Sequence, residues 1–400
     1  MEKAIINHLL CRTPIREVKL ESCAVGVVLL VCGENNTMMA EPEKQQEPRE
    51  PEQKASPANI EDKGQLARFC WLLLRNALKD AEWRTRACAA WGIGVAAERL
   101  PEEYAGPALD ALSEAAADHD GFVRFWVVEA IGKLGTEENV PLVRAALNDK
   151  DDYVRINAAK ALAQLGQPEG SKILIETLEM SPSMVTTSAR SSNSRREWKL
   201  KVFAIECLGE VGSLAAIPHI VRLLRQPHWP VRASSAWALG IIGDRGAVQQ
   251  VRPLLHDSEK LARISAAESL GRLGEQDAAG LLKASLIDEN KTVKYKAAES
   301  LAKLGYRTGV ELLSDALKDP DTNIQSMAVT ALGKLGDTSV LKLLAEKLDA
   351  KSWHLRADAA VAVGRLGDPK ALPFLKKRLE DPAKNVRVCA AVAILMLIGR

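Results

Sequence analysis

Histidine and cysteine are the residues of this 400-residue chain best suited to bind a metal or to act as nucleophiles, and both are scattered. The seven cysteines form no CxxC pair, and the chain has no Walker loop, nucleophile elbow or zinc-ligand spacing. The histidines form no repeated ligand pair; they are His8, His119, His219, His228, His256 and His354. We therefore predict no catalytic residue, no metal site and no cofactor.

The charge of the chain is nearly balanced, with a formal net charge of +2 at pH 7. A charge this small creates no strong field for nucleic acid or for a membrane surface. Cysteines without a disulfide pattern are typical of a reducing compartment. We therefore expect a cytoplasmic protein with reduced thiols, for which nucleic acid is not a favoured partner.

A repeated phrase organises most of the chain and must position any functional side chain. It reads Val-Arg-x-x-Ala-Ala and is clearest at residues 154–166. The position of its arginine recurs at Arg86, Arg124, Arg155, Lys201, Arg232, Arg263, Lys294, Gln325, Arg356 and Arg387. The successive steps are 38, 31 and 46 residues, followed by six steps of 31. A fixed period in this range indicates a stacked array of about ten repeats.

Each repeat contains two apolar segments with helical spacing. In residues 138–166 the apolar residues recur three and four positions apart, which places each set on one face of a helix. Asp151 is placed to cap the second helix, and Gly166 is placed to end it. The glycines that are equivalent to Gly166 are Gly212, Gly243, Gly274, Gly305, Gly336 and Gly367. The alanines are small enough to let helices of neighbouring repeats approach closely.

The full phrase, Val-Arg-x-x-Ala-Ala-x-Ala-Leu-Gly-x-Leu-Gly-Asp, resembles the HEAT-like repeat of the phycobilin lyase type over roughly residues 65–400. The resemblance implies an all-α fold, an α-solenoid (superhelix) of about ten two-helix repeats. It also implies that the second helix of each repeat lines the concave face. Arginines of the phrase would bond to neighbouring loops and form a structural ladder of Arg86, Arg124, Arg155, Arg232, Arg263, Arg356 and Arg387.

An iron-binding enzyme family also has HEAT-like repeats. Deoxyhypusine hydroxylases bind two irons through repeated His-Glu pairs, and this chain contains no His-Glu dipeptide. The oxygenase interpretation is therefore unfavoured.

Aromatic residues are concentrated at the positions that the phrase leaves variable. Six outward positions in each of ten repeats make 60 of the 400 positions, so even placement would put about two or three of the 17 aromatic residues there. Twelve occupy them, ten of these in repeats one to five. We predict a partner-binding groove formed by Phe122, Phe125, Trp126, Tyr153, Trp198, Phe203, Trp229 and Trp237. The alternative is that some rings at helix starts, notably Trp83, Trp198, Trp229 and Trp353, only pack between adjacent repeats.

Basic residues dominate the same positions in the second half of the array. The set that we predict to bind anions is Lys260, Arg272, Lys291, Lys296 and Lys303. Acidic residues such as Glu268 and Glu299 interrupt it, so a solvated polar face is an equally good interpretation.

These patterns favour a non-catalytic scaffold that binds a protein or peptide partner in the concave groove. The resemblance also supports a bilin lyase subunit or a bilin-handling chaperone, because a planar tetrapyrrole with propionates would suit rings beside lysines. A DNA-binding HEAT-like protein is a third alternative, and the balanced charge disfavours it.

The first 63 residues are expected to lie outside the array. Residues 1–39 are a doubtful leader: either translation starts at Met38 or Met39, or the apolar run at 23–32 belongs to a signal for a lipoprotein anchored through Cys32. That run is too short to span a bilayer, so no transmembrane span is expected. Residues 40–63 are rich in proline and glutamate and are predicted to be a disordered tether.

Two further segments depart from the repeat that occupies residues 64–400. A Ser/Arg-rich insert at 181–196 lengthens the turn between the helices of the fourth repeat, and long loops in compact arrays often carry function. The alternative is a surface insertion that the array merely tolerates. The last helix ends in the apolar run 392–398, with no polar capping repeat after it. We predict that this helix docks on another surface, such as a second copy of the chain.

Overall fold

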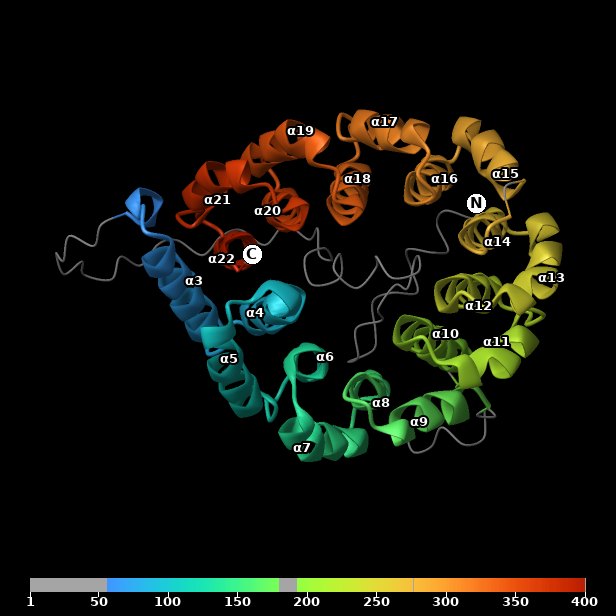
Figure 1. The fold of residues 1–400 in the computed structure, drawn as a ribbon, viewed down its shortest axis with the longest axis horizontal. Coiled ribbons are helices and arrows are strands. Elements are labelled where there is room, and N and C mark those ends of the chain that lie inside the picture. The colour runs from blue at the N-terminus through green and yellow to red at the C-terminus, as the bar shows by residue number, and fades with distance from the viewer. Residues whose placement is uncertain (1–55, 180–192, 276, 400) are drawn as a thin grey trace.

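The computed structural model describes residues 56–179, 193–275 and 277–399. The regular secondary structure in these ranges consists of α-helices and 3₁₀ turns, without a strand. Twenty α-helices, α3 to α22, form ten antiparallel pairs in this part of the chain. The predicted α-solenoid of about ten two-helix repeats is therefore confirmed. Figure 1 shows that the pairs follow one another around a closed ring.

The second helix of each pair forms the inner layer of the ring, and the first helix forms the outer layer (Figure 1). The inner helices are α4 (Trp83–Ala96), α6 (Gly121–Leu134), α8 (Asp152–Gln164), α10 (Asn193–Val211), α12 (Trp229–Ile242), α14 (Lys260–Arg272), α16 (Lys291–Lys303), α18 (Thr322–Leu335), α20 (Trp353–Leu366) and α22 (Lys384–Ile398). The outer helices are α3 (Lys63–Ala77), α5 (Glu102–Ala115), α7 (Val140–Ala145), α9 (Pro168–Glu179), α11 (Ile217–Leu223), α13 (Val248–Val251), α15 (Ala278–Ala284), α17 (Arg307–Ala316), α19 (Leu341–Glu346) and α21 (Leu372–Arg378).

Local signals set the ends of the inner helices. Asp151 accepts a hydrogen bond from the backbone N–H of Tyr153 and caps α8, as its position predicts. The seven glycines of the phrase, from Gly166 to Gly367, all adopt positive φ values between 70° and 97°. This left-handed conformation suits glycine and ends each helix before the next repeat begins.

Small side chains bring neighbouring inner helices together. A Cβ atom on Gly132 would lie 2.7 Å from the Cβ of Ala161 in the next repeat, and a Cβ on Gly364 would lie 2.6 Å from the Cβ of Ala393. Real Cβ atoms do not approach this closely, so the glycine and alanine positions of the phrase set the helix spacing. Buried leucine, valine, isoleucine and alanine side chains fill the space between the two layers.

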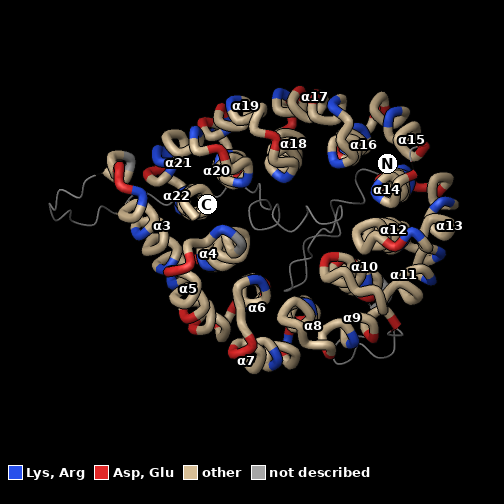
Figure 2. The backbone as a smooth tube through the Cα atoms, in the orientation of Figure 1, with Lys and Arg blue, Asp and Glu red and all other residues tan. Residues whose placement is uncertain are grey.

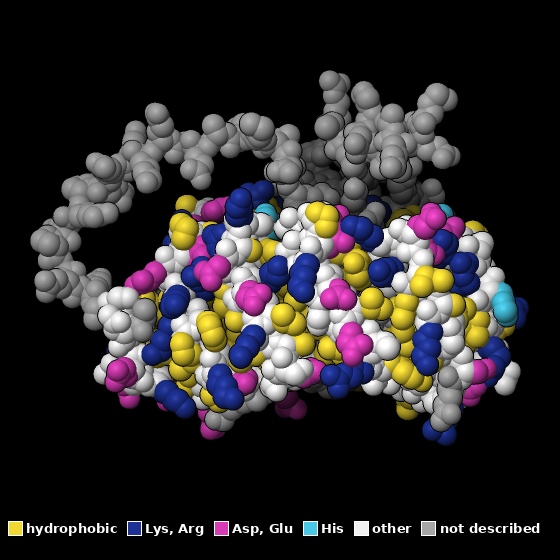
Figure 3. Space-filling model, turned by 90° about the horizontal axis from the view of Figure 1, so that it is seen from above, with side chains coloured by type: hydrophobic (Ala, Val, Ile, Leu, Met, Phe, Trp, Pro, Cys, Tyr) yellow, Lys and Arg dark blue, Asp and Glu magenta, His cyan; other side chains and the backbone are white. Residues whose placement is uncertain are grey.

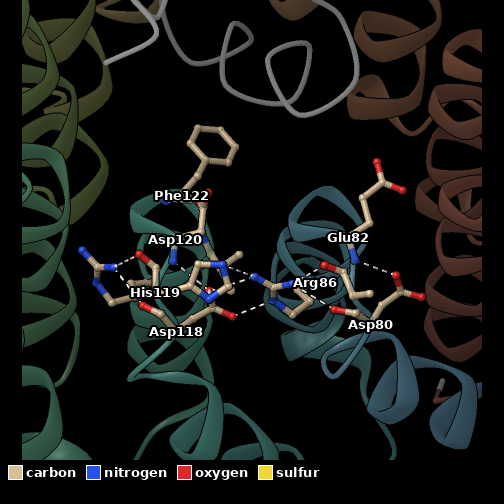
Figure 4. A network of polar contacts seen from close by, with 10 residues as sticks. Asp80, Glu82, Arg86, Asp118, His119, Asp120 and Phe122 are labelled. Atoms are coloured by element: carbon tan, nitrogen blue, oxygen red, sulfur yellow. Dashed lines mark hydrogen bonds and ion pairs between the residues drawn. The ribbon is translucent and has the colours of Figure 1, made fainter. Parts of the chain in front are cut away.

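The ladder arginines join successive repeats. Arg86 donates from Nη1 to the carbonyls of Asp80 and Ala81 in its own turn, and from Nε and Nη2 to the carboxylate of Asp118 in the next turn (Figure 4). Arg124, Arg232 and Arg356 make the same contacts, with Asp149, Asp257 and Asp381 as acceptors. Arg155, Arg263 and Arg387 donate to carbonyls of their own turns. We call each of these bidentate arginine–aspartate contacts a ladder rung; it fixes the angle between two successive repeats.

The last inner helix closes the ring on the first repeat. Helix α22 packs against α3 and α4, and nearly all its side chains from Val386 to Met396 are buried. The Sγ atoms of Cys389 on α22 and Cys88 on α4 lie 3.8 Å apart. The expectation that α22 docks on a second copy is therefore corrected. Its apolar surface is covered by the first repeat of the same chain, which replaces a polar capping repeat.

The end of the segment predicted as a tether also lies against the last repeat. The 3₁₀ turn Pro57–Asn59 contacts α21, Ser56 donates a hydrogen bond to Glu380, and Lys376 donates one to the carbonyl of Ile60. The described residues 56–60 therefore lie against the array. The predicted leader with Cys32, the rest of the tether, and residues 181–192 of the Ser/Arg-rich insert lie outside the described residues.

The outer surface carries charges of both signs. Figure 3 shows lysine, arginine, aspartate and glutamate side chains interspersed over the outer helices on one side of the ring, with apolar side chains between them. Within the described residues, no helix is both long enough and apolar enough to cross a membrane.

Candidate interaction surface

The inner face of the ring gathers the positions that vary between repeats. We count these positions from the ladder position of each repeat, which is occupied by Arg86 in the first and Arg387 in the tenth. Residues two, five and nine positions after it share one face of an inner helix, because they are three and four residues apart. Residues two and three positions before it lie at the start of the helix.

Aromatic residues of α6, α8 and α10 form one connected cluster rather than a row of separate rings. Phe125 lies 5.0 Å from Trp126 and 5.7 Å from Phe203, measured between ring centroids. Phe122 lies 6.2 Å from Trp126, and Tyr153 lies 5.7 Å from Phe203. These contacts join α6, α8 and α10, so the rings of three repeats brace one another.

The predicted groove residues divide into two groups by exposure. Phe125, Trp126, Phe203 and Trp237 are buried, each with 8% or less of its surface exposed. Their main role in the structure is packing between inner helices. Phe122, Tyr153, Trp198 and Trp229 are only partly buried and lie in the first two turns of α6, α8, α10 and α12. Figure 4 shows Phe122 projecting away from the ladder. We call these four residues the aromatic rim.

Two tryptophans of the predicted groove differ from the other rings in their polar surroundings. The indole N–H of Trp126 is buried and has no hydrogen-bond acceptor, which is a costly arrangement in a packed interior. Trp198 stacks on His228 with ring centroids 5.9 Å apart. The aromatic rim therefore continues across the turn before α12.

The five basic residues predicted to bind anions are each paired with carboxylates of the chain. Lys260 reaches Asp288 at 2.7 Å, and Lys291 reaches Asp319 at 2.7 Å. The other three lie together between α14 and α16: Arg272 pairs with Glu268, Lys296 with Glu299, and Lys303 with both. An anion would have to compete with these carboxylates.

A second buried ion network was not predicted from the sequence. Lys160 on α8 lies 3.0 Å from Glu129 on α6 and 2.5 Å from Glu210 on α10. Burial alone would raise the pKa of Glu129, but Lys160 and Lys133 outweigh it and lower that pKa to about 2. Glu129 and Lys160 are both five residues after the ladder position, and this shared register was the available sequence signal.

Glu206 occupies the same register on α10 and behaves differently. Burial raises the pKa of Glu206 to about 7, although the hydroxyl of Ser234 donates a hydrogen bond to its carboxylate at 3.1 Å. Two carboxyl groups in equivalent positions thus have opposite pKa shifts, because one has a lysine in contact and the other does not.

No group in the described residues has the composition of a metal centre: no three or more histidine, cysteine, aspartate and glutamate side chains converge there. The four cysteines of these residues, Cys70, Cys88, Cys207 and Cys389, are buried and reduced.

Comparison with known proteins identifies the repeat. The family model of HEAT repeats matches residues 72–155, 109–194, 190–271, 248–324 and 310–396. No curated protein matches the chain.

Solved structures resemble the chain only loosely. The complex of CpcE and CpcF of phycocyanin lyase from Nostoc sp. PCC7120 is 22% identical, with a TM-score of 0.41, and the match covers 63% of this chain and 93% of that chain. Human deoxyhypusine hydroxylase is 22% identical, with a TM-score of 0.33, over 67% of this chain and 98% of that chain. An engineered protein is 18% identical, with a TM-score of 0.29, over 82% and 98%. The repeated matches to one model, spread over nearly the whole array, show that the chain belongs to the HEAT repeat family.

Proposed function

We propose that this chain is a non-catalytic scaffold whose inner face binds a protein or peptide partner along the aromatic rim. The observation that supports the proposal is the partial exposure of Phe122, Tyr153, Trp198 and Trp229 in the first two turns of four successive inner helices. Aromatic side chains bury a large area at little entropic cost and are frequent anchors at interfaces. Curved repeat arrays commonly use their concave surface for binding.

The buried half of the cluster supports the rim. Phe125 and Phe203 contact Phe122 and Tyr153, with ring centroids 6.3 and 5.7 Å apart. A buried second layer holds the exposed rings in place, so a partner loses less free energy in ordering them. The arrangement suits an apolar stretch of a partner protein.

A bilin-handling function is the alternative that the same surface allows. Nζ of Lys199 lies 5.9 Å from the ring centroid of Trp198, so a cation lies beside the aromatic rim. This cation could pair with a propionate of a bilin that is stacked on the rim. Addition of a free bilin to the purified chain, followed by absorbance, separates the two functions. Saturable binding that is lost on Trp229→Ala would support the bilin function over the scaffold.

A photo-cross-linking experiment tests the scaffold directly. A photoreactive phenylalanine analogue is placed at Tyr153 and, as a matched control, at Phe374, which is 42% exposed on the outer helix α21. In extracts of the native cell we expect a specific protein adduct at position 153 and none at 374. Identical adducts at the two positions, or no adduct at either, would contradict partner binding at the aromatic rim.

A further inference from the structure

The ring closes at the junction between the tenth repeat (α21 and α22) and the first repeat (α3 and α4), which we call the seam. Figure 2 shows α22 lying beside α4 there. At each of the other nine junctions the backbone runs from one repeat into the next, so successive repeats stay tethered. The seam instead joins residues such as Lys384 and Asp80, which are 304 positions apart. Within the described residues, non-covalent contacts hold it.

The polar contact at the seam is weaker than a ladder rung. In a rung, an arginine such as Arg124 donates twice to the aspartate six residues before the next ladder position. Asp80 has that position in the first repeat, and it accepts from Lys384 at 2.8 Å. The Lys384 side chain is 53% exposed, and exposed ion pairs contribute little free energy. The seam is therefore the junction at which the ring opens most readily.

Two thiols meet at the seam. The Sγ atoms of Cys88 on α4 and Cys389 on α22 lie 3.8 Å apart, and each residue is 2% exposed or less. Each cysteine is two residues after the ladder position of its repeat. The other eight repeats have no cysteine at this position, where they carry Trp126, Asn157, Phe203, Ser234, Ser265, Lys296, Met327 and Asp358. Cysteine thus occupies the same position in the two repeats that meet without a backbone link.

We infer that Cys88 and Cys389 form a reversible disulfide bond, which locks the ring when a peroxide oxidises the two thiols. A disulfide bond is about 2.05 Å long, so the two sulfur atoms must approach each other by about 1.8 Å. Rotation of the thiols about their Cα–Cβ bonds brings sulfur atoms of packed helices together over such a distance. The bond supplies the covalent link that the seam lacks. The inference is independent of the proposed function.

The reaction consumes two thiols and one hydrogen peroxide. The sulfur of one cysteine attacks a peroxide oxygen, the O–O bond breaks, and the departing hydroxide takes the thiol proton and leaves as water. The product is a sulfenic acid. The sulfur of the second cysteine attacks the sulfenic sulfur, the S–S bond forms, the S–O bond breaks, and a second water leaves with the second thiol proton. A dithiol reverses the reaction by thiol–disulfide exchange.

Burial determines when the thiols react. Both are shielded from solvent in the closed ring, so peroxide reaches them when the seam opens. When the ring closes again, the second thiol returns to contact with the oxidised sulfur. Gly92 and Val392 pack together one helical turn farther along, which leaves little room for a second peroxide. The geometry therefore favours the disulfide over further oxidation of a single cysteine.

The position of the two cysteines in the chain makes the bond strongly stabilising. They are 301 positions apart, so the cross-link closes a loop that contains most of the array. A cross-link restricts the unfolded chain more strongly as its loop becomes longer. The oxidised chain is therefore a ring that stays closed, whereas the reduced chain is a ring that opens at the seam.

The test uses the full chain, which is treated with a small excess of hydrogen peroxide, blocked at its remaining thiols and digested with trypsin. Cys88 and Cys389 lie in the peptides 87–99 and 388–400, each of which contains one cysteine. Mass spectrometry without reduction shows whether these two peptides are joined. Thermal unfolding is then measured for oxidised and reduced wild type, Cys88→Ser and Cys207→Ser. Cys207, which is 1% exposed on the inner helix α10, provides the matched control.

We expect peptides 87–99 and 388–400 to be joined in the main disulfide product. Oxidised wild type is expected to unfold at least about 5 °C above reduced wild type, and dithiothreitol should abolish the difference. Cys88→Ser should show no such rise, and Cys207→Ser should keep it. Comparing the two states of one variant cancels the cost of the substitution, and the peptide linkage in wild type requires no substitution.

Four results would overturn the inference. They are a main product that joins other cysteines, unlinked or singly oxidised Cys88 and Cys389, a linkage without a rise in unfolding temperature, and a rise that persists in Cys88→Ser. None of them affects the cross-link expected at Tyr153, so the disulfide and the scaffold function are tested separately.

Discussion

Lys384 donates from its Nζ to the carboxylate of Asp80 at 2.8 Å, although 304 positions separate the two residues. Lys260 reaches Asp288 at 2.7 Å, and Lys291 reaches Asp319 at 2.7 Å, between neighbouring repeats. In all three pairs the lysine is three residues before one ladder position, and the aspartate is six residues before the next. The tenth repeat therefore forms with the first repeat the same lysine–aspartate pair that the sixth and seventh repeats form with their successors.

The packing at this junction differs from the others in one respect. In most repeats the residue eight positions after the ladder position is glycine. This glycine packs against a small residue of the next repeat, which lies six positions after that repeat's own ladder position, as Gly132 packs on Ala161. The tenth repeat has Leu395 at the first position, and the first repeat has Gly92 at the second. A Cβ on Gly92 would lie 2.4 Å from Cγ2 of Val392. At this junction the glycine therefore lies on the first repeat, and Val392 of the tenth repeat packs against it.

Enlarging Gly92 is predicted to strain the ring closure. Gly92→Val would force its side chain into Val392, and overpacking of this kind typically costs about 1–3 kcal/mol. We expect a lower thermal unfolding temperature and a larger hydrodynamic radius, both partly restored by Val392→Ala. The matched control is Gly106→Val on α5, where no atom lies within 4 Å of an added Cβ. Equal losses in the two valine variants would show that the contact with Val392 is unimportant.

A ladder rung is predicted to contribute more free energy than an exposed ion pair. Arg232 and Asp257 have side-chain exposures of 15% and 5%, and the hydrogen bond from Arg232 lowers the pKa of Asp257. Removing one member of such a pair costs about 2–4 kcal/mol, because the other charge is left poorly solvated.

The measurement is a double-mutant cycle with Arg232→Ala and Asp257→Ala, followed by chemical denaturation. The control cycle uses Arg144 and Glu169, whose side chains are 51% and 35% exposed. We expect a coupling energy above about 1 kcal/mol for the first pair and less for the second. A first coupling no larger than the second would contradict the structural role of the ladder.

The architecture could be predicted from the sequence because every repeat contains the same signals for where its helices begin and end. Asp151 and Gly166 mark the ends of one helix, and equivalent residues mark the others. Ring closure was not readable in this way, since curvature accumulates from small rotations between many repeats. Its local signals were the apolar run at 392–398, which no polar capping repeat follows, and the glycine at position 92. They indicate closure once the first and last inner helices are known to meet.

The sequence predicted only part of how these side chains are arranged. Periodicity identified which residues lie on the inner helices, but it could not decide whether a ring points into the interior or onto a neighbouring helix. Trp126 and Phe203 are buried against other rings, whereas Phe122 and Tyr153 are partly exposed. The same limit applies to Lys303, whose pairing with Glu268 depends on the angle between α14 and α16.

Glu206 is predicted to make stability depend on pH. Its pKa in the folded chain, about 7, is above the ordinary value of 4.5, so the folded state holds this proton more tightly than the unfolded state. The stabilisation from this proton is fully present below about pH 4.5 and is lost as the pH rises through 7. A shift of this size corresponds to about 3 kcal/mol.

The measurement compares the free energy of unfolding of wild type and Glu206→Gln between pH 4.5 and 8. We expect wild type to lose stability relative to the variant across this interval, because glutamine keeps the hydrogen bond to Ser234 without acquiring a charge. Glu176→Gln, which alters an exposed glutamate on α9, is the control. A difference between wild type and Glu206→Gln that stays constant with pH would refute the shift.

The most direct measurement of the closed ring is the distance between its two ends. Spin labels are attached at Asp80→Cys and Lys384→Cys in a chain whose Cys11, Cys23 and Cys32 are replaced by serine, and the distance is measured by pulsed electron paramagnetic resonance. Closure predicts a single narrow population at about 20 Å, since the native side chains are in contact and each label adds its own length. An open array of ten repeats, spaced about 10 Å apart, would separate the labels by well over about 60 Å and would contradict the closed ring.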